Sequence, residues 1–105
     1  MNDFTIPADG PLIASEADFL DLVGNAAYSG AERIVVPAGR LSPDFFRLST
    51  GLAGAILQKC STYQLKVVIV GDIAGHMARS GPLRDFVYES NRRGDVRFIA
   101  TDAEL

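Results

Sequence analysis

The sequence predicts a single α/β domain, residues 1–105, built on a small, open and mostly parallel sheet. Two apolar runs rich in β-branched residues, at 34–37 and 65–70, are typical of strands in a parallel sheet with helices above and below it. Segments with helical spacing of apolar residues alternate with such runs, as they do in α/β folds. A chain of 105 residues provides one hydrophobic core without room for a second.

The N-terminal part predicts two short strands followed by a helix. Residues 3–6 and 11–14 flank a turn-forming PADG segment, and we expect them to pair as an antiparallel edge of the sheet. Ser15 then begins a helix as its capping residue, with Asp18 in the position where a capping box prefers Glu. This helix should end near Gly30. Its buried face is expected to consist of apolar residues at helical spacing, namely Phe19, Leu20, Val23, Ala26 and Ala27.

The central segment, 40–63, predicts a helix with two successive starts. Ser42 and Pro43 form the first, since a Ser side chain caps a helix and Pro is tolerated at its first position. The string 49–51 (STG) supplies a second set of cap residues, so we expect a kink or a new helix there. The inward face of the helix that follows is predicted to carry Leu52, Ala53, Ile56, Leu57, Cys60 and Tyr63.

The remaining chain completes the alternation. An irregular loop is expected at 72–81, a helix from Pro82 to a stop at Gly94, and a last strand at 96–100. The predicted order is β-β-α-β-α-β-α-β. In open α/β sheets ligands bind outside the carboxyl ends of the strands, so a site is expected at the edge that collects 37–42, 71–81 and the N-terminus of the central helix.

Composition narrows the classes of function. The net charge of −3 argues against nucleic acid as the main partner, because that binding depends on clustered Lys and Arg. One Cys and one His do not make a disulfide framework or a Cys/His zinc site. No apolar run approaches the roughly 20 residues of a membrane helix, and the N-terminus lacks the pattern of a signal peptide. We therefore expect a cytoplasmic protein without a metal or cofactor.

Residues at the second helix start are the first candidates for a binding site. Ser49, Thr50, Gly51 and Gly54 could hold an anion, because free N–H groups and the helix dipole converge there. The spacing matches neither common nucleotide-binding motif. The structural alternative is that Thr50 caps the helix and that the two glycines allow close packing on the sheet. A third reading is phosphorylation of Ser49 or Thr50, which would add charge at the favourable helix end.

Two further candidates lie at the predicted strand end. Asp72 follows the strand 65–70 and His76 lies in the next loop, so either could face a ligand. The favoured interpretations are an ordinary turn at Asp72 and an exposed loop histidine at position 76. Cys60 is predicted to be a buried apolar residue and not a nucleophile. Phe45 and Phe46 are adjacent, and two adjacent residues cannot both point inward on a helix. One of them is therefore expected at an interface with another chain.

Three segments carry a resemblance to a known family. The sequences DFFRLSTGLAGAILQK, VVIVGD and LRDFVYESNRRG resemble those of the uncharacterised bacterial domain-of-unknown-function 4180 family, over about Ile13 to Ala100. This resemblance implies a shared fold and no particular activity.

The segment IVVPAGRLSPDFFRLSTGL is also similar in layout to the anti-sigma-factor antagonist (STAS) domain, in which a buried strand, a loop and a helix beginning with Ser or Thr follow one another. The resemblance implies a STAS-like fold and, in regulatory members, phosphorylation of a Ser at that helix start. The corresponding residue here would be Ser49 or Thr50, and Leu48 stands where those domains have Asp.

Two functions remain open at this point. The first is a non-enzymatic regulatory or protein-interaction module with a STAS-like fold, whose contact surface is residues 42–54. The second is a small enzyme or ligand-binding protein that holds an anionic small molecule at the strand-end crevice near Gly51. No catalytic residue is assigned. The expected partner is a protein, with a homodimer as one form, and neither nucleic acid nor membrane.

Overall fold

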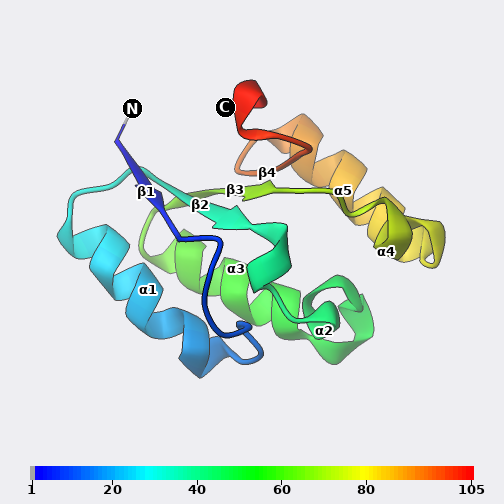
Figure 1. Ribbon diagram of the computed structural model, residues 1–105, viewed down its shortest axis with the longest axis horizontal. Helices are drawn as coiled ribbons and strands as arrows, with labels where there is room; N and C mark the ends of the chain where they lie inside the picture. Colours follow the sequence, from blue (N-terminus) through cyan, green and yellow to red (C-terminus); the bar gives the residue numbers. More distant parts are fainter. Residues whose placement is uncertain (1) are drawn as a thin grey trace.

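The computed structural model describes residues 2–105 and contains one four-stranded parallel sheet (Figure 1). Its strands are β1 (Asp3–Thr5), β2 (Arg33–Pro37), β3 (Lys66–Val70) and β4 (Val96–Ile99), in the spatial order β1-β2-β3-β4. Each neighbouring pair is parallel, with Ile34 opposite Val67 and Val67 opposite Val96. The predicted α/β class with a small open sheet is confirmed.

Three helices connect successive strands, and short helical pieces extend the connections. The connecting helices are α1 (Glu16–Tyr28), α3 (Leu52–Thr62) and α5 (Gly81–Arg93). The short pieces are α2 (Pro43–Phe46), α4 (Ala74–Ala78) and the 3₁₀ turns η1 (Ala38–Arg40), η2 (Leu48–Thr50) and η3 (Asp102–Glu104). No helix within residues 2–105 has the length and apolar character needed to cross a bilayer.

The main core lies on one face of the sheet only. Sequential strand order combined with the right-handed rule for crossovers puts every connecting helix on the same side. The inward residues of that face, such as Ile34 and Ile69, pack in one cluster with Phe19 of α1, Ile56 of α3 and Leu83 of α5. Figure 1 shows α1 and α3 below the sheet and the C-terminal turn above it. The expectation of helices above and below the strands is therefore wrong.

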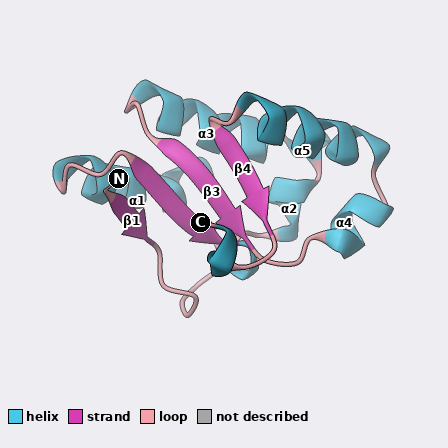
Figure 2. Ribbon diagram, turned by 90° about the horizontal axis from the view of Figure 1, so that it is seen from above, coloured by secondary structure: helices cyan, strands magenta, loops and turns pink. Residues whose placement is uncertain are grey.

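The opposite face of the sheet has a small cluster of its own. Val35, Val68 and Ile99 point to this side and are 3%, 1% and 7% exposed. Figure 2 shows the strands from this side, with η3 in front of them. Arg33 and Asp3 also face it and form a two-pronged ion pair, with Nε to Oδ1 at 2.9 Å and the second nitrogen to Oδ2 at 2.7 Å. The centres of β2 and β3 are therefore apolar on consecutive residues because both faces are buried there, although only one face is covered by the connecting helices.

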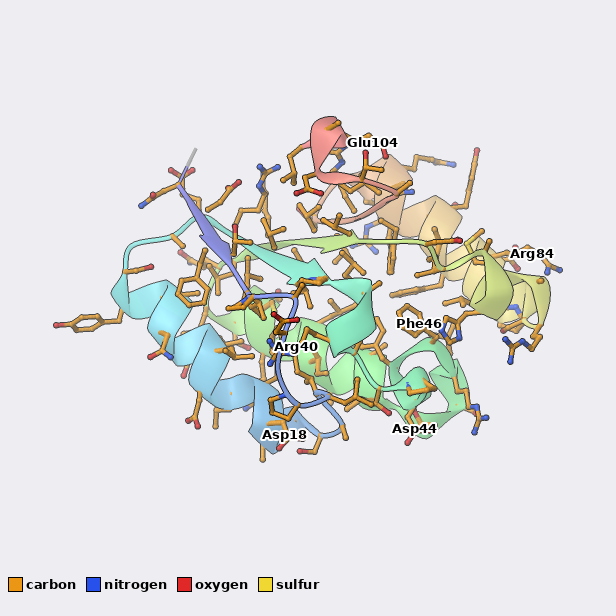
Figure 3. The ribbon with its side chains drawn as sticks, in the orientation of Figure 1. Asp18, Arg40, Asp44, Phe46, Arg84 and Glu104 are labelled. Carbon is orange, nitrogen blue, oxygen red and sulfur yellow. The ribbon has the colours of Figure 1, made fainter. Side chains whose placement is uncertain are left out.

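The N-terminal segment differs from its predicted form. β1 pairs with β2 in a parallel arrangement, and residues 11–14 form only an isolated bridge from Ile13 to Leu41, not a second strand. The reason is that Arg40 draws the intervening loop toward itself. Its guanidinium donates to the carbonyl oxygens of Pro7 (2.7 Å), Asp9 (3.1 Å) and Pro11 (3.0 Å), as its position beside the loop in Figure 3 illustrates.

Arg40 is only 8% exposed, and its nearest partners are carbonyl groups and not a carboxylate. The loop approaches so closely that a Cβ on Gly10 would lie 2.8 Å from the guanidinium carbon. Gly10 also has φ +143°, a conformation that L-residues rarely adopt. The hydrogen bonds from Arg40 to the loop thus take the place of the strand pairing that the sequence pattern had predicted for residues 11–14.

The helix limits follow from local capping. Ser15 accepts a hydrogen bond from Asp18 N at 3.1 Å and begins α1, which ends two residues before the predicted stop at Gly30. Leu20 and Tyr63 were expected inside but are 42% and 46% exposed. The predicted loop 72–81 contains α4, which begins where Asp72 Oδ1 accepts from Ala74 N at 2.9 Å.

The outer edge of β4 is closed by a side chain. Asn91 of α5 forms two bonds with the backbone of Phe98: its Oδ1 accepts from Phe98 N at 2.7 Å and its Nδ2 donates to Phe98 O at 3.4 Å. Asn91 thus occupies the place of a backbone neighbour and ties α5 to the sheet.

We expect Arg40→Leu to lower the free energy of unfolding by at least about 2 kcal/mol, because a single hydrogen bond from a charged group typically contributes about 1.5–3 kcal/mol and Arg40 makes three. Urea unfolding measures this. Arg92→Leu is the matched control, since its ion pair with Glu89 is exposed, and it should change the value by less than about 0.5 kcal/mol. Equal effects of the two substitutions would show that the three carbonyl contacts do not stabilise the fold.

The two glycines at the start of α3 should respond oppositely to alanine. Gly51 has φ +78°, so Gly51→Ala should cost about 1 kcal/mol of unfolding free energy. Gly54 is helical and a Cβ there meets no atom within 4 Å, so Gly54→Ala should stabilise by about 0.5–1 kcal/mol. Thermal or urea unfolding of both variants tests this. A shift in the same direction would contradict the assigned backbone conformations.

Acid should remove the contribution of the Asp3–Arg33 pair. Hydrogen bonding from Arg33 holds the pKa of Asp3 below its ordinary value. The pair therefore stabilises the fold above that ordinary pKa, and this stability is lost as the pH falls through the folded-state pKa. The difference in unfolding free energy between wild type and Asp3→Asn, followed by urea unfolding, should shrink between about pH 5 and about pH 2.5. A difference that does not vary with pH would rule out this linkage.

Candidate functional site

The connections that leave the carboxyl ends of β2 and β3 enclose a crevice. The first connection contains α2 and η2, and the second contains α4. Between them lies a polar hollow of about 340 Å³. Its walls are formed by Phe46, Arg47, Leu48, Ser49, His76, Arg79, Ser80 and Pro82. We call this hollow the strand-end crevice; its position agrees with the predicted edge of the sheet.

Two stacked rings form one wall of the strand-end crevice. The imidazole of His76 lies nearly parallel to the ring of Phe46, with centroids 4.3 Å apart and an angle of 13°. Phe45 meets Phe46 edge to face at 5.2 Å. Figure 3 shows Phe46 between α2 and α4. The histidine ring is thereby held by a flat apolar contact.

Both phenylalanines are buried, with Phe45 1% and Phe46 3% exposed. The expectation that one of them would be exposed at an interface is wrong. The argument from helical spacing fails because α2 has only four residues, and the chain then folds back through η2. Both rings belong to the main core, and His76 of α4 also covers Phe46.

Two arginines give the strand-end crevice a positive character. Arg47 has one carboxylate neighbour, Asp44, at the long distance of 4.0 Å, and both side chains are exposed. Arg79 donates through Nε to Gly75 O at 3.0 Å, which keeps its guanidinium at the rim. Neither Asp nor Glu is among the residues that line the hollow. In a chain of net charge −3, this is a local concentration of cationic groups.

Serine hydroxyls add hydrogen-bonding capacity. Ser80 already caps α5 by accepting from Leu83 N at 3.2 Å, whereas Ser49 is exposed and forms no side-chain hydrogen bond with another described residue. The strand-end crevice therefore combines two cations, an imidazole and a hydroxyl. Such groups bind carboxylates and phosphates through charge-assisted hydrogen bonds.

Thr50 and Gly51 have structural roles at this site. The hydroxyl of Thr50 lies within donating distance of Asp44 O (2.7 Å) and Arg47 O (2.9 Å) and accepts from Leu52 N at 3.3 Å. It thus joins α2, η2 and the start of α3. Gly51 is the left-handed residue that lets α3 begin immediately after η2. These contacts support the capping interpretation and place the Thr50 hydroxyl among backbone groups.

The other predicted residues lie apart from the strand-end crevice. Asp72 lines a separate hollow of about 300 Å³ at the ends of β3 and β4, and its Oδ1 is used to begin α4. Gly54 faces a groove between α3 and α5. No atom lies within 4 Å of a Cβ placed on Gly51 or Gly54, so close packing on the sheet does not explain either glycine. Of the six binding candidates, only Ser49 and His76 share one hollow.

Sequence reasoning missed Arg47, Arg79 and Ser80. A usable signal was present, since both arginines lie within a few residues of candidates in the two connections that end at the carboxyl edge. Applying the strand-end rule to every charged residue of those connections would have included them. Cys60 is 1% exposed, and burial raises the pKa of its thiol to about 12, which makes it a poor nucleophile.

No cluster of three or more metal-ligating side chains was found among residues 2–105. No hydrogen bond joins His76 to Ser49 or Ser80, so these residues do not form a nucleophile–base pair in the described chain. The side chains that line the strand-end crevice are suited to the recognition of a charged group.

Comparison with known proteins identifies the family of the chain but indicates no activity. No curated protein and no solved structure matches it. The similarity in layout to the STAS domain therefore stays a prediction. The family model described as Domain of unknown function (DUF4180) matches residues 2–105, which is nearly the whole chain. The protein therefore belongs to the DUF4180 family.

Proposed function

We propose that this protein binds a small anionic ligand in the strand-end crevice, with Arg47 and Arg79 as its charge partners. The observation that carries the proposal is the convergence of two arginines and one histidine on a hollow without a lining carboxylate. Because the whole chain is acidic, its overall field does not attract anions. Selection of an anion must therefore be local, and this hollow is where cations gather.

The dimensions and chemistry of the strand-end crevice suggest the class of ligand. A volume of about 340 Å³ is at the small end of ligand sites. Arginine suits planar or tetrahedral oxyanions, and Ser49 can donate a further hydrogen bond. The imidazole of His76, supported from behind by the buried ring of Phe46, offers one flat wall. A compact carboxylate or phosphate ester fits these features.

The other function expected from the sequence was a regulatory or protein-interaction module that uses residues 42–54. That hypothesis was based on the absence of a catalytic constellation and on the STAS-like layout, and it predicted an exposed apolar patch near Phe45 or Phe46. Both rings are buried, so the anion site has the better support. In this proposal, any regulatory role of the protein would follow from ligand binding in the strand-end crevice.

Binding should be saturable and sensitive to salt. We expect inorganic phosphate or acetate, titrated by NMR at low ionic strength, to shift the amide signals of residues 47–50 and 76–80, and the affinity to fall as salt is added. Arg47→Gln and Arg79→Gln should each weaken binding about tenfold, since a charge-assisted hydrogen bond is typically worth 1.5–3 kcal/mol.

Arg92→Gln is the matched control, because it removes one exposed arginine from α5 outside the strand-end crevice. It should leave the affinity unchanged. If all three substitutions weaken binding alike, the effect comes from net charge, and the proposed site is wrong. If neither anion shifts the named amides, anion binding in the strand-end crevice is excluded as the function.

A further inference from the structure

A second hollow lies between α3 and α5 and shares no residue with the strand-end crevice. It has a volume of about 340 Å³ and continues into a smaller hollow of about 240 Å³ around the end of α3. Leu57, Ser61, Asp95 and Val96 line both parts, so they form one continuous groove. We call this the α3–α5 groove. It follows α3 from Gly54 to Ser61, roughly 10 Å at 1.5 Å per residue, and continues past the end of the helix to Gln64.

The walls of the α3–α5 groove are largely apolar. Leu57 of α3, Phe86 of α5 and Val96 of β4 are partly buried and pack against the main core. The ring of Phe86 is fixed by an edge-to-face contact with Phe98, with centroids 6.1 Å apart. Gly54 lacks a side chain at the place where one would narrow the space. The groove is thus a preformed apolar hollow that opens to solvent.

One largely buried serine lines this wall. The inward stripe of α5 runs through Leu83 and Val87 and then places Ser90, not an apolar residue, against the groove. Ser90 is only 9% exposed, and its side chain forms no hydrogen bond within residues 2–105. No side-chain oxygen of the described chain is both fully enclosed and unpartnered, so this hydroxyl is reached by solvent through the groove. A polar group of a bound molecule would take the place of that solvent as the hydrogen-bond partner of Ser90.

The charges at the rim are balanced. Arg93 and Asp95 carry opposite charges and both line the α3–α5 groove. Neither takes part in an ion pair within 4.0 Å among the described residues. One cation and one anion together give no preference for a charged ligand. This distinguishes the groove from the strand-end crevice, where cations prevail.

We propose that the α3–α5 groove is a second ligand site, which takes an uncharged, mainly apolar small molecule with one hydroxyl or carbonyl group. The apolar body lies against Leu57, Phe86 and Val96, and the polar group pairs with the Ser90 hydroxyl, which can donate or accept. A volume of about 340 Å³ suits a molecule of one or two rings. The inference is independent of the anion site, because it uses different residues and different chemistry.

The test uses p-cresol, a methylated ring with one hydroxyl, and toluene, which lacks the hydroxyl. NMR titration of the whole protein should show saturable p-cresol binding with a dissociation constant on the order of 1 mM or lower. The shifted amides should lie in α3, in α5 and at Val96. Toluene should bind at least about fivefold more weakly. Ser90→Ala should remove this difference by weakening p-cresol alone.

A filling substitution provides the second arm. Gly54→Leu puts a side chain into the α3–α5 groove without a clash, since no atom lies within 4 Å of its Cβ, and should weaken p-cresol binding at least tenfold. Gly24→Leu is the matched control: Gly24 is also helical, exposed and free of neighbours within 4 Å, but lies in α1. It should leave binding unchanged.

Failure to detect p-cresol binding, shifts centred outside the groove, or wild-type affinity in Gly54→Leu would each overturn the proposal. Equal binding of p-cresol and toluene, unaltered by Ser90→Ala, would also overturn it, because the hydroxyl is what defines the ligand class. Phosphate titration of Gly54→Leu separates the two sites. Unchanged anion binding there, together with lost p-cresol binding, is the expected result.

Discussion

The order in which the strands follow one another is the constraint on which this structure depends. Because β1 to β4 are adjacent in sequence as well as in space, and crossovers prefer one hand, all three connecting helices share one face of the sheet. A sheet of this kind has no point at which the strand order reverses, which is where doubly wound proteins open their ligand crevice. Any site must come from the connections themselves. In this protein the short helices α2 and α4 lengthen two adjacent connections and leave space between them.

The residues that shape that space are mostly held by small local bonds. Thr50 ties two turns to the start of α3, Asp72 begins α4, and Ser80 begins α5. Each of these side chains uses an oxygen to hold a helix start. The long cations that line the hollow, Arg47 and Arg79, cap no helix. Helix capping in these loops thus falls to short side chains, and the positive charge of the hollow comes from long ones.

Sequence patterns predicted the regular parts of this fold well. The β-branched runs at 34–37 and 65–70 became β2 and β3, and Ser15, Ser42, Pro82 and Gly94 mark helix limits as expected. The failures have long-range causes. Residues 11–14 resemble a strand, but their loop is held by Arg40, about thirty residues away. Phe46 is buried by a helix contributed from the next connection, which no local periodicity reports.

The hollow was predictable in position but not in the residues that line it. Strand-end reasoning selected the carboxyl edge of the sheet, where Ser49 and His76 share a hollow, and its role as a binding site stays a prediction. It also grouped Thr50, Gly54 and Asp72 with them, because residues close in sequence were assumed to face the same way. Ser90 shows a different limit of sequence analysis. A serine on the apolar stripe of a helix is unremarkable in the sequence. It stands out only in the structure, where it is largely buried and has no hydrogen-bond partner in the described chain.

The two bonds from Asn91 to Phe98 bear on how the molecule behaves in a crowded solution. Phe98 is the residue of β4 whose N–H and C=O point away from β3, and an exposed edge of this kind is a template for strand addition by another chain. The side-chain amide of Asn91 resembles a peptide group. It occupies the hydrogen-bonding positions of Phe98 that a strand of another chain would otherwise use. At the other edge, β1 offers only three residues. The sheet thus ends in two poor starting points for fibrous growth, so the apolar strands between them are protected from aggregation.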